Sequence, residues 1–217
     1  MSAQPRIVEV RERVLKQNDL LARELRAGFR EAGVRVFSLV SSPGAGKTTL
    51  LEKTLSVLSG QHRVAALVGD LATENDAVRL RRSGALVKQI VTGTVCHLDA
   101  SMVATALGEW DLAGLDLLFI ENVGNLVCPS SYDLGEELRV VLLSATEGED
   151  KPLKYPTIFN SADVAVITKI DLAGPAELDR EAVHRNIQEV RPGMRVLEVS
   201  AKTGVGMNRW LELIKRS

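Results

Sequence analysis

Apolar residues along the chain follow two alternating patterns, short continuous runs and longer stretches with helical spacing. The continuous runs lie at 34–40, 64–68, 87–91, 115–120, 140–143, 164–167 and 196–199. Such runs are typical of strands that are covered on both faces of a parallel sheet. Stretches with helical spacing include one that ends near 58 and those at 98–110, 175–190 and 205–215. This alternation predicts an α/β fold with a mainly parallel sheet of about seven strands flanked by helices.

The first segment of the chain has a different pattern from the rest. Apolar residues recur at helical spacing from Ile7 to Phe29, with charged residues between them, and Gly33 is a stop signal. We therefore expect residues 1–33 to form an N-terminal amphipathic helix that packs on the outside of the sheet, followed by a single P-loop domain over 34–217. The alternative is an interaction arm. The least regular stretch, 147–160, is expected to be an ordered loop or switch.

Composition and charge narrow the class of protein. The chain has 217 residues, of which 45% are apolar and 25% charged, as in globular domains with a proper core. A net charge of −1 argues against binding of nucleic acid through a general positive field. The sequence contains no apolar run of membrane-spanning length and no signal-peptide core, and it has two cysteines. These features predict a cytoplasmic protein that contacts neither membrane nor nucleic acid.

A glycine-rich segment directly follows the first continuous run and precedes a helical stretch. Residues 41–49 match the Walker A pattern, except that Ser41 stands where the pattern has its first glycine. Backbone N–H groups of such a loop, together with the following helix N-terminus, bind phosphate groups. We expect a lysine on the β- and γ-phosphates and a threonine on Mg²⁺. The predicted nucleotide-binding residues here are Gly44, Ala45, Gly46, Lys47, Thr48 and Thr49.

Three further segments distinguish guanine-nucleotide binding from other P-loop chemistry, and each follows a predicted strand. Glu121 and Gly124 stand in an acidic-x-x-Gly element of the kind that senses a γ-phosphate. Thr168, Lys169 and Asp171 are similar to the Asn-Lys-x-Asp motif that reads guanine. The Asp171 carboxylate can accept hydrogen bonds from guanine N1 and the exocyclic amine, a donor pair that adenine lacks. Because Thr168 replaces the asparagine of the motif, one amide contact to the base is lost. The third segment, at Ser200, Ala201 and Lys202, is expected to form a loop that supports the base.

The predicted chemistry is in-line attack of water on the γ-phosphate of GTP. Lys47, Asp70 and Glu121 are the candidate catalytic residues, and Asp70 is expected to hold Mg²⁺ through water together with Thr48. No motif identifies an arginine finger or a water-positioning glutamine, so turnover is expected to be slow. Glu74 and Asp76 follow Asp70 and are expected either to order with nucleotide or to stabilise a helix N-terminus.

The two cysteines lie in two loops that also follow predicted strands. Cys96 and His97 are adjacent in one loop, and Cys128 lies four residues after Gly124 in the other. The carboxyl ends of strands in an open parallel sheet are where ligands bind. Two thiolates and an imidazole suit Zn²⁺ or Ni²⁺. Three ligands leave a position open, as a carrier needs, or two copies of the chain share the metal across a dimer interface. The alternative is that the cysteines are ordinary buried apolar residues.

Several of these segments together resemble the HypB family of hydrogenase maturation GTPases. The resemblance covers about 34–202 and rests on SSPGAGKTT, VGDLATENDA, TGTVCHLDASM, FIENVGNLVCPSSYDLGE, EGEDKPLKYP and TKIDL. It implies the SIMIBI class of P-loop GTPases, a nucleotide-dependent homodimer and a Zn²⁺ or Ni²⁺ site at Cys96, His97 and Cys128. It further implies GTP-dependent delivery of nickel to the large subunit of [NiFe]-hydrogenase, with the small zinc protein HypA as a partner.

One departure from the family pattern bears on metal storage. The N-terminal cysteine motif and the histidine-rich stretch of some members are not found in this sequence, which has three histidines. The loop cluster is therefore expected to carry the metal function. Lys151 and Lys154 are either contacts to nucleotide across a dimer or solvated loop charges.

Three alternatives to this function remain open at this point. A urease nickel chaperone belongs to the same GTPase class, although its Cys-Pro-His tripeptide differs from the sequence here, where Pro129 precedes Ser130. A P-loop small-molecule kinase would need a base beside an acceptor site, and Asp171 would then have no role. A non-catalytic module in which nucleotide only stabilises the fold would release no phosphate over multiple turnovers.

Overall fold

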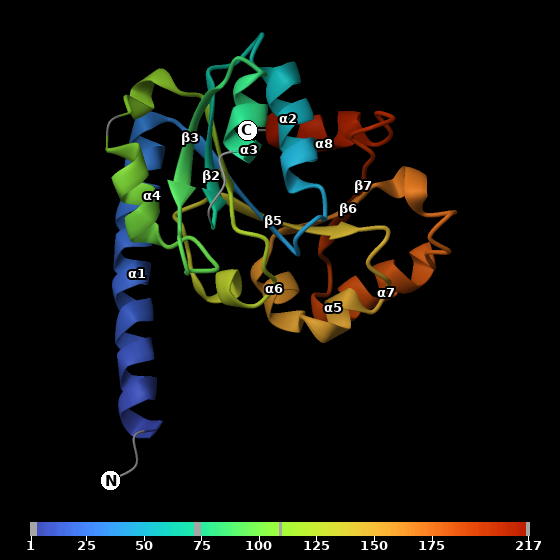
Figure 1. Ribbon diagram of the computed structural model, residues 1–217, viewed down its shortest axis with the longest axis horizontal. Coiled ribbons are helices and arrows are strands. Elements are labelled where there is room, and N and C mark those ends of the chain that lie inside the picture. Colours follow the sequence, from blue (N-terminus) through green and yellow to red (C-terminus); the bar gives the residue numbers. More distant parts are fainter. Residues whose placement is uncertain (1–3, 72–74, 109, 216–217) are drawn as a thin grey trace.

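The computed structural model describes residues 4–71, 75–108 and 110–215. Helices and strands alternate along the chain (Figure 1). The strands are β1 (Arg35–Ser41), β2 (Val64–Asp70), β3 (Leu86–Val91), β4 (Leu117–Glu121), β5 (Leu138–Ser144), β6 (Val164–Thr168) and β7 (Arg195–Glu198). The helices are α1 (Gln4–Ala32), α2 (Lys47–Leu58), α3 (Asn75–Arg81), α4 (Ala100–Leu107), α5 (Lys151–Lys154), α6 (Pro156–Ser161), α7 (Arg180–Val190) and α8 (Met207–Lys215), with short 3-10 helices at Leu112–Gly114, Cys128–Ser131 and Ile170–Leu172.

The seven strands form one sheet in the order β3-β2-β4-β1-β5-β6-β7, and every pairing is parallel. This confirms the predicted fold class. In the register around β1, Phe37 lies opposite Phe119 on one side and Leu138 on the other. Because the chain leaves β1 in one direction for β2 and later returns to its other side, the carboxyl end of β1 is a switch point, where open α/β sheets bind ligands.

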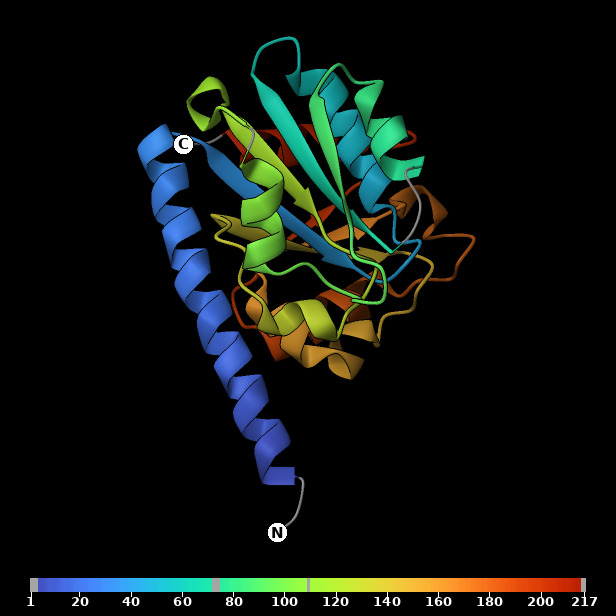
Figure 2. The same ribbon diagram turned by 60° about the vertical axis from the view of Figure 1, so that its left-hand side comes forward.

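Helices cover both faces of the sheet (Figures 1 and 2). On one face, Phe37 packs with apolar residues of α2, α3 and α8, including the fully buried Trp210. On the other face, Val36 packs with Phe29 and the apolar side of α4, while Val141 packs with residues of α6 and α7. Because neighbouring positions of β1 face opposite cores, the strand needs the continuous apolar run that predicted it.

Helix α1 differs between its two halves. Its second half lies against the body of the molecule, where Phe29 is buried and Asn18 hydrogen bonds to both α4 and the loop before β5. Its first half extends beyond the sheet, as Figure 2 shows clearly. Val10 and Val14, which belong to the apolar stripe expected to pack on the sheet, are 62% and 44% exposed. The side chain of Ile7 lies outside the described part of the chain.

Several element boundaries differ from the expected ones because capping residues set them. Asp99 and Asp179 accept the backbone N–H groups of Met102 and Ala182, so α4 and α7 begin after these aspartates. The stretch 147–160, expected to be a loop, contains α5 and α6, each opened by a proline in its first turn. Among the described residues, no helix is both long and apolar enough to cross a bilayer.

Candidate nucleotide and metal site

The loop between β1 and α2 places a lysine at the centre of a polar cavity. Gly44 and Gly46 have φ values of 73° and 92°, so the chain turns sharply through conformations that favour glycine. Lys47, the first residue of α2, is buried, and its Nζ donates a hydrogen bond of 2.8 Å to the Ser41 hydroxyl. Burial lowers the pKa of Lys47. Ser41, the departure from the Walker A pattern, therefore holds the lysine beside the loop.

A cavity of about 470 Å³ opens above this loop and collects the acidic residues predicted to act there. Its lining includes Asp70, Asp76 and Glu121, together with Gly124 and the P-loop. The Thr48 hydroxyl donates to Glu121 Oε1 at 2.7 Å. Glu121 Oε2 is buried and, among the described residues, has no hydrogen-bond partner. A carboxylate oxygen and a hydroxyl on the wall of a phosphate-sized cavity suit a hard cation such as Mg²⁺.

Glu121 has an unusual titration because it is enclosed. Burial raises the pKa of Glu121 to about 7, although the Lys47 ammonium and the Thr48 hydroxyl favour its charged form. The side chain is at the end of β4, an inner strand of the sheet, and the residue is 3% exposed. The protonation of such a carboxyl group therefore changes when a cation or a phosphate group binds in the same cavity.

A second cavity, of about 220 Å³, adjoins the first and is lined by the predicted base-binding segments. The two cavities share Gly46, Thr49 and Lys169 in their linings. The residues expected to read or support guanine all line the second cavity: Thr168, Lys169, Asp171, Ser200, Ala201 and Lys202. The arrangement gives one continuous site, polar at the phosphate end and mostly apolar at the base end.

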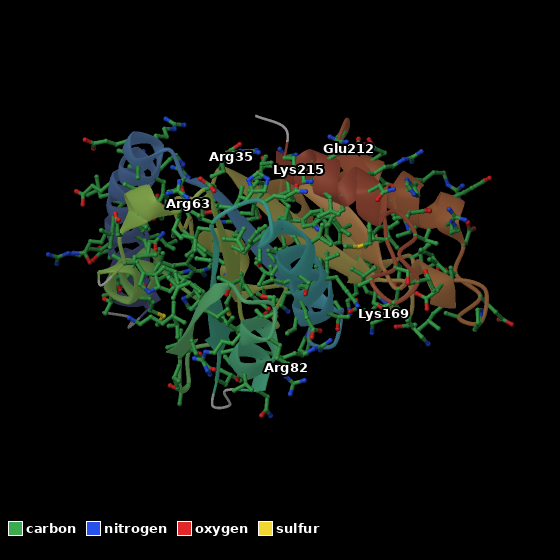
Figure 3. All side chains as sticks on the ribbon, turned by 90° about the horizontal axis from the view of Figure 1, so that it is seen from above. Arg35, Arg63, Arg82, Lys169, Glu212 and Lys215 are labelled. Atoms are coloured by element: carbon green, nitrogen blue, oxygen red, sulfur yellow. The ribbon has the colours of Figure 1, made fainter. Side chains whose placement is uncertain are left out.

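The base-binding segment is tied to the P-loop by two side chains. The Thr168 hydroxyl donates to the Ala45 carbonyl at 2.5 Å, and Lys169 Nζ donates to the Gly44 carbonyl at 2.7 Å. Figure 3 shows Lys169 beside the start of α2. Lys169 has a φ of 54°, in the left-handed region. The Thr168 hydroxyl thus holds the P-loop. The asparagine at the equivalent position of the guanine-reading motif gives no indication of this contact.

Cys96, His97 and Cys128 come together at the same end of the sheet. Their ligand atoms lie within 4.8 Å of one another, and all three residues are half-buried. The loops that carry them follow β3 and β4, which are separated in the sheet by β2. The cluster therefore lies across the carboxyl end of β2, where Asp70 also stands.

The donor atoms of this cluster are of the types that bind soft metal ions. The two sulfur atoms are 2.9 Å apart, and the hydrogen bond that they share raises the pKa of the Cys96 thiol. Burial lowers the pKa of His97, which favours the neutral imidazole that ligates metals. His97 stacks on Tyr132 at a ring separation of 4.0 Å, and its buried Nδ1 has no hydrogen-bond partner among the described residues. These residues fit Zn²⁺ or Ni²⁺, whose binding would displace the shared proton.

The remaining predicted residues lie in varied places. Asp76 is in the first turn of α3, which agrees with its helix-stabilising alternative, and it also lines the phosphate cavity. Glu74 is outside the described residues. Lys151 pairs with Glu147 at 3.4 Å, and Lys154, on the exposed side of α5, pairs with Asp150.

Two residues near the sites were given no role in the sequence analysis. Arg79 of α3 lines the phosphate cavity and donates to Thr49 and Glu52 at 3.1 and 2.7 Å. Tyr132 supports His97 from a loop 35 positions away in the sequence. For Arg79, the only local signal of its place near the phosphate cavity would have been a predicted helix after the second strand. No local pattern in the sequence indicates that Tyr132 stacks on His97.

Comparison with known proteins places the chain in a family. Residues 35–198 match the family model described as CobW/HypB/UreG, nucleotide-binding domain. Over 217 residues the chain is 49% identical to hydrogenase maturation factor HypB of Azotobacter chroococcum, covering 99% of this chain and 70% of that protein. The chain belongs to the HypB family. This confirms the resemblance stated from its motifs.

Two further relatives bear on the chemistry of the family. The hydrogenase/urease maturation factor HypB of Helicobacter hepaticus is 52% identical over 169 residues, covering 76% of this chain and 69% of that protein. The crystal structure of HypB from Helicobacter pylori in complex with nickel matches with a TM-score of 0.86 and 40% identity, covering 91% of this chain and 93% of that chain. The family model names a nucleotide-binding domain, so binding and hydrolysis of nucleotide are the general chemistry expected of this fold.

Proposed function

We propose that this chain binds and hydrolyses GTP and carries nickel for insertion into [NiFe]-hydrogenase. The observation that carries the proposal is that Cys128 of the metal cluster lies on the same segment as residues 121–124, which line the phosphate cavity. The end of β4 provides Glu121 to one site, and the segment that follows provides Cys128 to the other. The nickel complex of the H. pylori relative supports nickel as the ion that is carried.

During hydrolysis, the residues of the phosphate cavity would stabilise negative charge on the phosphates and position the nucleotide and the metal ion. The P-loop amides and Lys47 would hold the β- and γ-phosphates and stabilise the charge that spreads over them during in-line attack of water. Thr48, Asp70 and Glu121 would hold Mg²⁺, which supplies further positive charge at the phosphates. Asp171, at the apolar end of the site, would select guanine. Turnover should be slow, because the proposed machinery lacks an identified water-positioning glutamine.

The cluster of cysteines and histidine has the properties of a carrier site. Two sulfur atoms and one imidazole leave a coordination position open for a ligand from another protein. We propose a HypA-like zinc protein and the hydrogenase large subunit as the partners of transfer, and a nucleotide-dependent homodimer as the active form. Zn²⁺ can occupy the same donors. A change at the γ-phosphate that displaces residues 121–124 would alter the position of Cys128 and so the affinity for metal.

The proposal is tested by measuring phosphate release and nickel binding on the same protein. Multiple turnovers with GTP and not with ATP are expected. Lys47→Ala should lower the turnover at least about 100-fold, as loss of one charge-stabilising donor does. Lys53→Ala is the matched control, because Lys53 is an exposed lysine of the same helix, and its turnover should stay within about twofold of the wild type. Full activity of Lys47→Ala contradicts the phosphate assignment.

The outcomes also separate the alternative functions. Turnover with ATP and an acceptor would indicate a kinase, and nucleotide binding without phosphate release would indicate a non-catalytic module. The dual hydrogenase/urease name of the H. hepaticus relative favours urease as a second target. Restoration of urease and of hydrogenase activity in cells that lack the corresponding maturation factor would distinguish the two targets.

A further inference from the structure

Asn122 lies between the two sites and contacts the loops of both. It follows Glu121 at the end of β4 and is 2% exposed. Its backbone N–H donates to the Leu39 carbonyl at 3.0 Å, which fixes its backbone to β1. Its side-chain Oδ1 accepts the N–H of Leu98 at 3.0 Å and the N–H of Val123 at 2.9 Å. One oxygen atom therefore holds the residue after His97 and the first residue of the segment that leads to Cys128.

The segment that contains Asn122 also contacts the P-loop at two points. Glu121 accepts the Thr48 hydroxyl, and Gly124 lies so close to the P-loop that an added Cβ would stand 2.9 Å from the Pro43 Cα. Since both contacts involve groups that line the phosphate cavity, a nucleotide bound there would contact and displace residues 121–124. Asn122 is placed to pass that displacement to the next loop.

The loop that carries two of the metal ligands is anchored on this segment. Leu98 is fully buried, and its side chain packs on β2, where a Cβ added to Gly69 would meet it at 2.8 Å. Asn125 adds a second tie, because its Nδ2 donates to the Cys96 carbonyl at 3.2 Å. A buried backbone N–H that loses its acceptor is costly, so the loop follows the asparagine when the segment moves.

We propose that Asn122 is the positioning residue through which the nucleotide site controls the metal ligands Cys96 and His97. The inference rests on the proposed function, because it takes both nucleotide and nickel as ligands of this chain. Without this tie, only Cys128 and the Asn125 contact to Cys96 would respond to nucleotide, so most of its effect on the geometry of the three ligands would be lost. With it, the thiol and imidazole of the other loop shift together with residues 121–124.

Asn18 provides a matched control for a purely structural role. Like Asn122, it is a buried asparagine whose Oδ1 accepts a backbone N–H of the same loop region, that of Ala100 at 2.9 Å. Unlike Asn122, it belongs to α1, and its second hydrogen bond goes to the Asp133 carbonyl at 2.9 Å, beyond Cys128 and outside residues 121–124. Asn18→Ala and Asn122→Ala should therefore loosen the loop similarly, and only the second should break the connection to the nucleotide site.

The experiment measures the Ni²⁺ affinity of the whole chain loaded with Mg-GDP and with a non-hydrolysable GTP analogue. In the wild type the two affinities should differ by at least about fivefold, the lower end of typical coupling between sites. The ratio should fall below about twofold in Asn122→Ala and stay at the wild-type value in Asn18→Ala. By reciprocity, Ni²⁺ should change the affinity for the analogue relative to GDP by the same factor, and this factor should also be lost in Asn122→Ala.

Each other outcome has a distinct meaning. A wild-type ratio in Asn122→Ala overturns the inference, and so does an equal loss in Asn18→Ala, because the role is then only structural. Wild-type protein that binds nickel and nucleotide with a ratio of one overturns the inference and leaves the proposed nickel and GTP binding in place. Wild-type protein that binds no nickel contradicts the proposed function itself.

Amide hydrogen exchange gives a second measurement that needs no variant. In metal-free wild-type protein, protection of the peptide that contains residues 96–100 should differ between Mg-GDP and the GTP analogue, because the Leu98 N–H is bound to Asn122. Equal protection in the two states overturns the inference even if Asn122→Ala fails to fold.

Discussion

The phosphate cavity and the cysteine–histidine cluster border the same sheet edge but hold their key side chains in opposite ways. Lys47 and Glu121 are 7% and 3% exposed, and each has a partner from the P-loop region. Cys96, His97 and Cys128 are half-buried and are held mainly by one another and by the ring of Tyr132. A rigid, enclosed site suits a ligand bound the same way in every cycle, whereas a lightly held cluster suits an ion that must leave.

Loss of a thiol should separate the two regions most strongly. Cys128→Ser is expected to lower Ni²⁺ affinity by more than about 100-fold, because even the loss of an outer-shell partner costs about 10–100-fold. GDP affinity should stay within about twofold, since Cys128 is not part of the phosphate cavity lining. Calorimetric titration of both ligands checks this. Ser130→Ala, on the same 3-10 helix, is the control; a large loss of GDP affinity in Cys128→Ser would show that the sites are not separable.

The buried carboxyl group should give the next largest effect, on stability. The pKa of Glu121 is raised to about 7 in the folded protein, against 4.5 as its ordinary value. The folded state therefore binds the proton more tightly, and its stability should fall as pH rises from about 4.5 to about 7 and then level off. Glu121→Gln should remove this decline and stabilise the protein at pH 8 by about 3 kcal/mol.

Urea unfolding between pH 5 and pH 8, without Mg²⁺ or nucleotide, measures this difference between wild type and variant. Glu189→Gln, on the exposed side of α7, is the control and should show the wild-type dependence. A pH dependence that is the same in Glu121→Gln and wild type would show that Glu121 is not the group that titrates.

The contact of Gly124 with the P-loop should give a smaller change. In Gly124→Ala the new Cβ would stand 2.9 Å from the Pro43 Cα, which is backbone and must move. Overpacking of this kind costs roughly 1–3 kcal/mol, so a fall in GDP affinity of about tenfold is expected. Gly174→Ala is the matched control, because nothing lies within 4 Å of its added Cβ. Binding of a fluorescent GDP analogue checks both variants. Unchanged GDP affinity in Gly124→Ala would show that residues 121–124 move away from the P-loop without cost to nucleotide binding.

The parts of the molecule that could be predicted from sequence are those governed by local patterns. The seven strands follow from continuous apolar runs, and the P-loop follows from glycines and a lysine between a strand and a helix. The gathering of Cys96, His97 and Cys128 could be predicted because parallel strands end at one edge of the sheet. The structure brings these three together, and their role in metal binding remains a proposal.

The parts that could not be predicted depend on tertiary contacts or on very short elements. Helices α3, α5 and α6 have 7, 4 and 6 residues, too few for a helical period to be recognised. The bond from Thr168 to the Ala45 carbonyl joins residues 123 positions apart, and no local pattern encodes it. The first half of α1 has the apolar spacing of a packed helix but extends past the sheet, since spacing alone does not say what a face meets.

The separation of Cys96 and Cys128 along the chain has a consequence for the order of events in the cell. The two thiols are 32 positions apart and meet only when β3, β2 and β4 have assembled. A nascent or misfolded chain therefore lacks this binding site for the ion. Under the proposed function, the binding of nickel is linked to the folding of the protein that carries it. A chain that has bound nickel at this cluster has therefore already reached its native fold.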